Sequence, residues 1–341
     1  MMDYTKPWLF VDEQIDQLES RELAVGDRVN AGLLLTRVGY YRLTGYLYPF
    51  RVSSSPPDRD DTHTGRASNV YRSGTSVEHA AALIEFDREL RLLVLEAVER
   101  TELALRMRVA YTLGRVSAFA HEEVSTFVSS FTTTGQLDGD GNPILSKHAL
   151  WLERVKQRRD GSDESFVSHF REKYDDRMPI WALIEILELG HVSRLYGGLR
   201  NDLATEIATA FGAPSKRHMV SWIATVNYVR NVAAHHGRLF NKKLVQAPKR
   251  PAVAATPLLA HLSEGQPKKD FGVYSALAVI AYLLRAAYPC DDWPARMAAH
   301  LRSFPDAGPL DRESMGVAEG WLDVELWRPV GEEQALDYTE V

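Results

Sequence analysis

The chain has 341 residues, of which 45% are hydrophobic and 25% are charged, and its formal net charge is −6 at pH 7. These are ordinary globular proportions, and the length suffices for one large domain or two modest ones with a substantial core. The net negative charge argues against nonspecific binding of polyanions by the whole surface. The single cysteine, Cys290, excludes an internal disulfide framework and a cysteine-rich zinc site.

Two features that the sequence lacks indicate a soluble, cytoplasmic protein with no membrane partner. No segment approaches the roughly 18 uninterrupted apolar residues of a membrane span. The N-terminal residues MMDYTKPWLFVDEQ do not have the basic and then apolar layout of a secretory signal.

Helical periodicity dominates the chain, and hardly any stretch alternates regularly between polar and apolar residues. The predicted fold class is therefore mainly α. The N-terminal part, 1–51, is predicted to contain a short helix at 9–25 and a tyrosine-rich helix and turn at 33–51. Residues 52–75 are rich in Ser, Pro, Asp and Gly, which indicates a loop or linker.

The strongest helical signal begins after Ser76, a suitable N-cap, and extends to Gly114 without a proline. One long helix and two helices joined by a kink are both compatible with it. This segment opens a predicted helical core, 76–290, and residues 291–341 are predicted to form an extension that packs on this core. The further predicted helices are 148–159, 164–174, 179–198, 201–211, 215–236, 271–288 and 294–303.

The best candidate for a functional site is the sequence YVRNVAAHHGRLFN, which places Arg230, Asn231, His235 and His236 near the end of a predicted helix. Histidine can exchange protons near neutral pH. Arginine stays charged and offers a planar donor fork that suits phosphate oxygens. These residue types therefore predict a site that moves a proton beside a bound phosphate.

The choice between the two histidines depends on where the helix ends. If 221–238 is one continuous helix, His235 shares a polar face with Asn231, which lies one turn earlier and can orient its ring or contact a substrate. His236 then projects nearly opposite. Gly237 indicates that the helix loosens here, so His235 is the first choice and His236 stays an alternative.

RNA is a suitable substrate because it carries its own nucleophile, the 2′-hydroxyl, so that no metal ion or other cofactor is required. A neutral histidine can accept the hydroxyl proton, or a protonated one can donate to the leaving 5′-oxygen. Arg230 would hold the scissile phosphate and stabilise its developing charge. One histidine cannot easily be both acid and base, so we expect a homodimer with a composite active site.

The charge around these residues is uneven, which favours a localised site for an anion. Between residues 216 and 250 there are eight Lys and Arg and no Asp or Glu. Arg238, Lys242 and Lys243 are therefore candidates for RNA binding, and a solvated basic face is the alternative interpretation. The missing carboxylates also leave the histidine pair without the ligand set of a metal-dependent hydrolase.

Several segments, in this order, carry a resemblance to a known family: KPWLFVDEQIDQL, VGYYRLTGYLYPF, FDRELRLLVLEAVERTELALRMRVAY, PIWALIEILELGHVSRLY, YVRNVAAHHGRLFN and MGVAEGWLDVELWRP. The chain resembles the Abi-like (AbiD/AbiF) abortive-infection proteins of bacteria, which belong to the HEPN superfamily of helical RNases and RNA-associated proteins. The resemblance implies a HEPN-like helical bundle with N-terminal and C-terminal helical extensions.

The resemblance also implies an activity. The family motif, Arg-x4–6-His, matches Arg230 with His235 or His236, and superfamily RNases cut RNA without a metal from a dimeric site. Members are implied to act as anti-phage toxins, some with a small RNA partner, so a small-RNA or protein antitoxin is an expected partner. The alternative is a non-catalytic HEPN module that binds RNA or a protein.

Three charged residues in the matched segment FDRELR are further candidates. Asp87, Arg88 and Arg91 would orient the site from a neighbouring helix, and Arg88 and Arg91 would bind RNA. An ion-paired helix surface explains them equally well.

Overall fold

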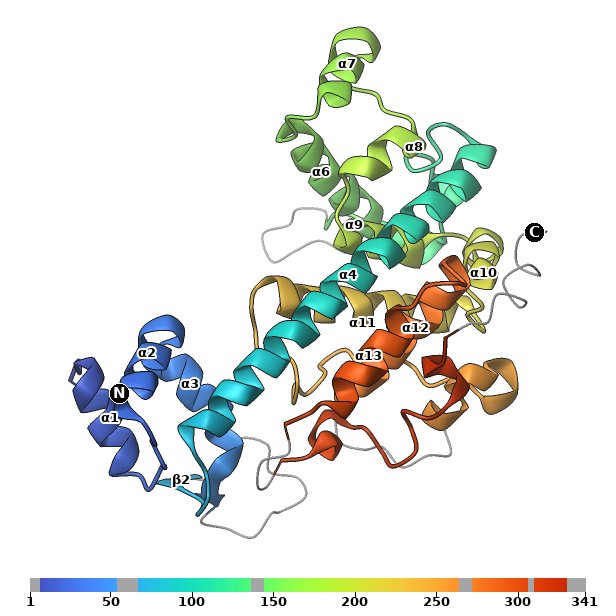
Figure 1. Ribbon diagram of the computed structural model, residues 1–341. Coiled ribbons are helices and arrows are strands. Elements are labelled where there is room, and N and C mark those ends of the chain that lie inside the picture. The colour runs from blue at the N-terminus through green and yellow to red at the C-terminus, as the bar shows by residue number, and fades with distance from the viewer. Residues whose placement is uncertain (1–6, 54–66, 136–143, 264–271, 306–309, 330–341) are drawn as a thin grey trace.

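The computed structural model describes residues 7–53, 67–135, 144–263, 272–305 and 310–329. The fold is mainly helical, which confirms the predicted class. The helix α4 (Val77–Val116) runs diagonally through the molecule in Figure 1, with α3 (Tyr40–Tyr46) packed near its N-terminal end and α8 (Ile180–Leu183) near its C-terminal end. Within the described residues, no helix is both long and apolar enough to cross a membrane.

The helix α4 is a single uninterrupted element of 40 residues, so the kinked alternative is wrong. At 1.5 Å per residue it is about 60 Å long. The Ser76 hydroxyl accepts a hydrogen bond from the backbone N–H of His79 at 3.2 Å and caps the first turn. Ser117 has an extended backbone and ends the helix.

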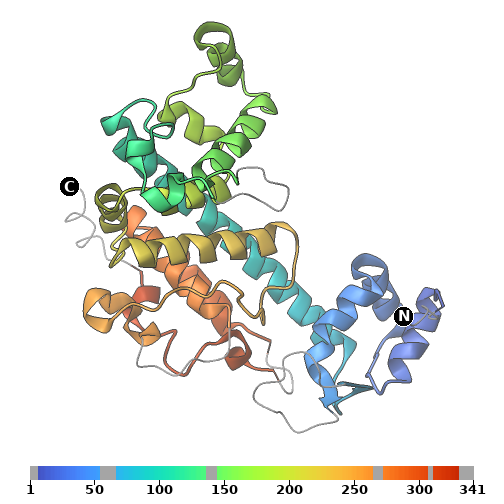
Figure 2. The same cartoon turned by 180° about the vertical axis from the view of Figure 1, so that it is seen from behind.

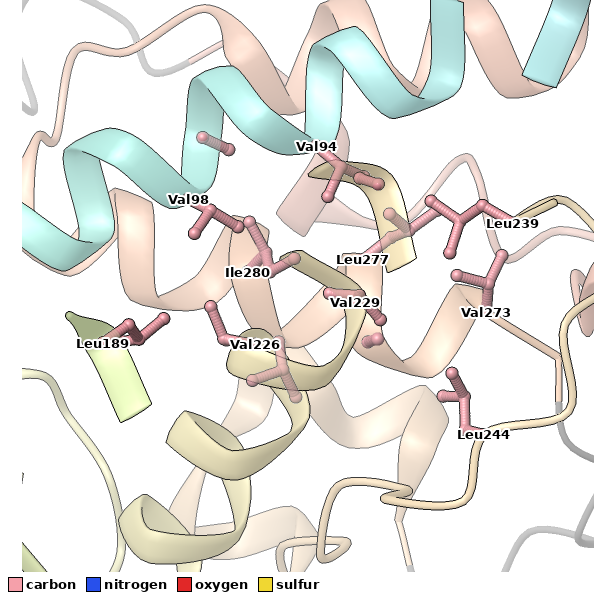
Figure 3. Close-up of a cluster of buried hydrophobic side chains, with 14 of the residues drawn as sticks. Val94, Val98, Leu189, Val226, Val229, Leu239, Leu244, Val273, Leu277 and Ile280 are labelled. Atoms are coloured by element: carbon pink, nitrogen blue, oxygen red, sulfur yellow. The ribbon is translucent and has the colours of Figure 1, made fainter. Parts of the chain in front are cut away.

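The core forms where α11 (Lys216–Ala234) and α12 (Tyr274–Ala287) pack against α4. Figure 2 shows α11 lying across α4. Buried aliphatic side chains form one cluster in Figure 3. They come from these three helices, from α9 (Leu189–Gly198) and from the segment that follows α11. Its labelled members are Val94, Val98, Leu189, Val226, Val229, Leu239, Leu244, Val273, Leu277 and Ile280. Each such side chain contributes about 1.5–3 kcal/mol when fully buried.

The N-terminal part differs from its prediction in two places. The predicted helix and turn at 33–51 is divided by Gly39, whose φ of 84° ends α2 (Arg28–Val38) before α3 begins. The predicted loop 52–75 contains the strand β2 (Ala67–Tyr71), which pairs antiparallel with β1 (Arg51–Ser53), while residues 54–66 lie outside the described part. The first helix, α1 (Val11–Glu19), is shorter than the predicted 9–25.

The predicted helix 179–198 is broken at Leu187 and Glu188, which both have extended backbone. The break separates η3 (Ile184–Ile186) from α9 and leaves backbone carbonyls without helical partners. The remaining α-helices are α5 (Ser129–Thr132), α6 (Lys147–Asp160), α7 (Ser165–Tyr174), α10 (Asn201–Ala210) and α13 (Trp293–Arg302). The remaining 3-10 helices are η1 (Tyr48–Phe50), η2 (Val124–Thr126), η4 (Val253–Ala255), η5 (Pro257–Leu262), η6 (Arg312–Met315) and η7 (Glu325–Trp327).

The buried carboxylate of Asp87 joins three distant parts of the chain. It is 0% exposed and accepts hydrogen bonds from the Tyr46 hydroxyl at 2.6 Å, the Leu239 N–H at 3.0 Å and the Phe240 N–H at 2.7 Å. It also forms an ion pair with Arg91. Burial and the Asp87 carboxylate together raise the pKa of Tyr46 to about 12, so its hydroxyl remains a donor. Asp87 therefore fixes α3 and the segment after α11 against α4.

Replacing Asp87 by Asn should lower the free energy of unfolding by roughly 3–5 kcal/mol, because Arg91 would be left as a buried, unpaired charge. Urea unfolding followed by circular dichroism measures the change. Arg88→Ala is the matched control, since Arg88 forms an exposed ion pair with Glu85 and should change stability by less than about 1 kcal/mol. An equal effect of the two substitutions would contradict the role of Asp87.

Candidate active site

The helix α11 ends at Ala234, earlier than the predicted 215–236, so both histidines of the motif lie in the turn that follows. His235 is the C-cap residue, with φ −90° and ψ 18°. His236 has φ 56°, in the left-handed region. A continuous helix over 221–238 is therefore wrong, and the side chains after Ala234 no longer follow the helical face.

Two backbone hydrogen bonds close this turn as a Schellman motif. The N–H of Gly237 donates to the Val232 carbonyl at 2.8 Å, and the N–H of His236 donates to the Ala233 carbonyl at 3.0 Å. His236 occupies the left-handed position that glycine usually takes, which costs a non-glycine residue about 1–2 kcal/mol. The guanidinium of Arg42 binds the His236 carbonyl at 2.8 Å and holds the turn from α3.

A cavity of about 560 Å³ opens beside this turn and brings three of the predicted catalytic residues together. Arg230, Asn231 and His235 line it, whereas His236 does not. The other lining residues come from α4, α6, η3 and the break before α9: Arg106, Arg158, Glu185, Ile186, Leu187 and Glu188. Of the two histidines, His235 therefore lies at the cavity, and its side chain is exposed.

The Asn231 side chain contacts the arginine of the motif. Its Oδ1 accepts a hydrogen bond from Nη1 of Arg230 at 3.2 Å. The backbone carbonyl of Asn231 accepts the His235 N–H at 3.0 Å. Among the described residues, Arg230 has no carboxylate within ion-pair distance, so its charge is available to an anion in the cavity.

Two arginines of the cavity, Arg106 and Arg158, were not predicted from the sequence. Arg106 donates to the Leu187 carbonyl at 2.6 Å and pairs with Glu102. The Nε of Arg158 donates to the Ile186 carbonyl at 2.9 Å. These bonds satisfy carbonyls at the helix break and fix both guanidinium groups at the cavity wall. The local sequence around the helix break does not indicate which distant arginines bind its carbonyls.

Carboxylates also reach the cavity, although the stretch 216–250 contains none. Glu185 lines it from η3, and Glu188 lines it from the break before α9. The sequence around the motif lacks carboxylates, but distant segments of the chain supply them to the site. In the part of the chain that the structure describes, no group of three or more His, Cys, Asp or Glu is placed to hold a metal ion.

The predicted RNA-binding residues are placed differently from one another. Arg91 is only 6% exposed and forms an ion pair with Asp87, so the predicted direct contact with RNA does not fit its position. Arg238 binds the Gly45 carbonyl, and burial lowers its pKa. Both arginines thus hold the N-terminal part and the motif segment in place.

The remaining candidates lie nearer the surface. Arg88 is exposed and forms bonds with Glu85 at 2.5 and 2.8 Å, as in the alternative of an ion-paired helix surface. Lys242 is half-buried and Lys243 is exposed. None of these three lines the cavity.

The fold and the cavity define a helical protein with a basic site beside an exposed histidine. The family model for the Abi-like protein matches residues 33–241, which is more than half of the chain and includes α4 and the whole cavity. The chain therefore belongs to the Abi-like protein family, which indicates a role in abortive infection. No curated protein and no solved structure matches it.

His236→Gly should raise the free energy of unfolding by up to about 1 kcal/mol, because glycine adopts the left-handed conformation without strain. His236→Ala is the matched control, since alanine also loses the ring but keeps the Cβ atom and the strain. Urea unfolding compares the two variants with the wild type. Equal stability of the glycine and alanine variants would contradict a strained turn.

Proposed function

We propose that the protein is a metal-independent endoribonuclease of the HEPN type that acts as an abortive-infection toxin against phage. The observation that carries the proposal is the convergence of Arg230, Asn231 and His235 on one cavity, with Arg106 and Arg158 on its other walls. A cluster of cations beside a proton-exchanging group suits a phosphodiester, and family membership supports the biological role.

In this mechanism the 2′-oxygen of RNA attacks the adjacent phosphorus, and the bond from phosphorus to the 5′-oxygen breaks. The 2′-hydroxyl gives its proton to a base, and the leaving 5′-oxygen receives a proton from an acid. His235 performs one of these transfers. Arg230, oriented by its bond to Asn231, stabilises the charge on the phosphoryl oxygens. The products are a 2′,3′-cyclic phosphate and a 5′-hydroxyl.

The second proton carrier is the His235 of another copy in a homodimer with a composite site. An apolar stripe on α4 supports this assembly: Leu103, Met107 and Tyr111 are 46%, 59% and 63% exposed. At 100° per residue, these side chains lie about 60–140° around the helix from Arg106, which lines the cavity. Two copies that meet at this stripe would bring their cavities close together.

The alternative function is a non-catalytic module that binds RNA or a protein partner. The arginines of the cavity support anion binding whether or not a proton is transferred. A small-RNA or protein antitoxin that covers the same cavity would silence the enzyme under the leading proposal. The two functions differ in whether the histidine ring is needed.

His235→Ala and Arg230→Ala should each lower the rate of RNA cleavage by about 10²–10⁴-fold, because they remove proton transfer and charge stabilisation. The measurement uses purified protein, a mixed RNA pool and a chelator, with mapping of the product ends. His236→Gly is the matched control and should retain activity. A folded His235→Ala variant with full activity would overturn the mechanism.

Met107→Glu should weaken self-association and lower cleavage at the same protein concentrations, because it places a charge in the apolar stripe. Leu92→Glu is the control, since Leu92 is 53% exposed on the same helix but about four turns from Arg106. Analytical ultracentrifugation and RNA cleavage across a dilution series test this. Unchanged activity of a monomer would instead assign the second proton transfer to Glu185 or Glu188 of the same chain.

A further inference from the structure

A second cavity of about 420 Å³ lies between α5, α6, α9 and the first turns of α11. It is lined by three cationic side chains, Lys147, Arg154 and Arg194, and by the hydroxyl-bearing residues Ser130 and Ser193. None of its lining residues also lines the first cavity. The residues of the sequence motif do not reach it, so the proposed cleavage leaves this cavity without a role.

Among the described residues, no acidic side chain accompanies the positive charge of this second cavity. Its lining contains no Asp or Glu. Within the described ranges, Lys147, Arg154 and Arg194 form no ion pair. Burial and the nearby charge of Arg154 both lower the pKa of Arg194, as expected for two guanidinium groups held together without a counterion. Such a cluster in a chain of net charge −6 favours an anionic ligand.

The helix α6 contributes to both cavities, because Arg154 lines the second and Arg158, about one turn later, lines the first. Burial lowers the pKa of His191, and the charges of Arg194, Arg154 and Arg158 act in the same direction, while Glu188 opposes them. The ring of His191 therefore lies within electrostatic reach of lining residues from both cavities.

The helix α11 indicates how far apart the two cavities lie. Val220 lines the second cavity, and Asn231 lines the first. At 1.5 Å per residue, these two positions are about 16 Å apart along the helix axis. Two phosphates of one extended strand can occupy both cavities only if a few nucleotides lie between them.

We propose that the second cavity binds a phosphate of the single-stranded RNA whose scissile phosphate occupies the first cavity. This inference rests on the proposed function and adds the path of its substrate. The RNA strand runs along α6 and α9, from the turn after α11 toward the N-terminal end of α11. Arg154 and Arg194 bind the distal phosphate. The site therefore recognises a segment of several nucleotides rather than a single phosphodiester.

Gly197 gives a way to close this cavity without disturbing the fold. It lines the cavity, and no atom lies within 4 Å of the position that a Cβ would take. Gly197→Ala therefore fits and favours the helix. Gly197→Glu places a carboxylate against the arginines and should exclude a phosphate. Comparison of Gly197→Glu with Gly197→Ala therefore distinguishes the effect of blocking the cavity from the effect of replacing the glycine.

The test measures RNA binding by the full-length His235→Ala protein, which prevents cleavage, with a labelled oligouridylate and a labelled uridine dinucleotide over a range of salt concentrations. Arg194→Ala and Gly197→Glu should weaken binding of the oligouridylate and leave the dinucleotide unaffected. For Arg194→Ala, the slope of log affinity against log salt should fall in magnitude by about 0.7, the value for one phosphate contact on a single strand.

Arg28→Ala and Gly197→Ala are the controls, because Arg28 forms an exposed ion pair with Asp16 far from both cavities. Equal oligouridylate binding by Arg194→Ala, Gly197→Glu and the controls would overturn the inference. So would loss of uridine monophosphate binding in Arg194→Ala with intact oligouridylate binding, since the cavity would then hold a free nucleotide. Failure of the proposed function is separate: the wild type would bind the oligouridylate in this two-cavity manner without cutting it.

Discussion

The arrangement of the site depends on one buried carboxylate, that of Asp87. It binds the backbone N–H groups of Leu239 and Phe240, just after the turn that carries the two histidines. It also binds Tyr46 and Arg91, so the N-terminal part and α4 meet at the same point. A fully satisfied buried network of this kind specifies one geometry. The direction in which the chain leaves α11, and hence the position of His235, follows from it.

The cavity itself is produced by a defect in regular structure. The helix break at Leu187 and Glu188 exposes backbone carbonyls, and Arg106 and Arg158 bind two of them. Arginine has five donors, so Arg158 keeps donors for a ligand after its backbone bond is made, and Arg106 keeps donors after its backbone bond and its ion pair with Glu102. These groups are held in place before substrate arrives, and preorganised charge is the most effective form of electrostatic stabilisation.

The sequence predicted the elements with strong periodicity and the residues that lie close together along the chain. The long helix over 76–114 is an example of the first, and the group formed by Arg230, Asn231 and His235 is an example of the second. It did not predict the partners contributed by distant segments: Arg106, Arg158 and Glu188 converge only through the fold. Arg91 and Arg238 look like surface cations in the sequence, but tertiary contacts bury the first and enclose much of the second. Gly237 indicated that the helix loosens here, but the left-handed conformation of His236 could not be predicted because glycine, its usual signal, stands one residue later.

The most direct test of the account uses the substrate rather than the protein. Cleavage sites are first mapped on an all-ribose oligonucleotide in chelator, and the same oligonucleotide is then made with a single 2′-deoxynucleotide immediately 5′ of one mapped bond. The account predicts cyclic phosphate and 5′-hydroxyl ends at every mapped site, and loss of cleavage at the deoxy position alone. Continued cleavage at that bond, or products with 5′-phosphate ends, would show that the 2′-hydroxyl is not the nucleophile and would contradict the central claim.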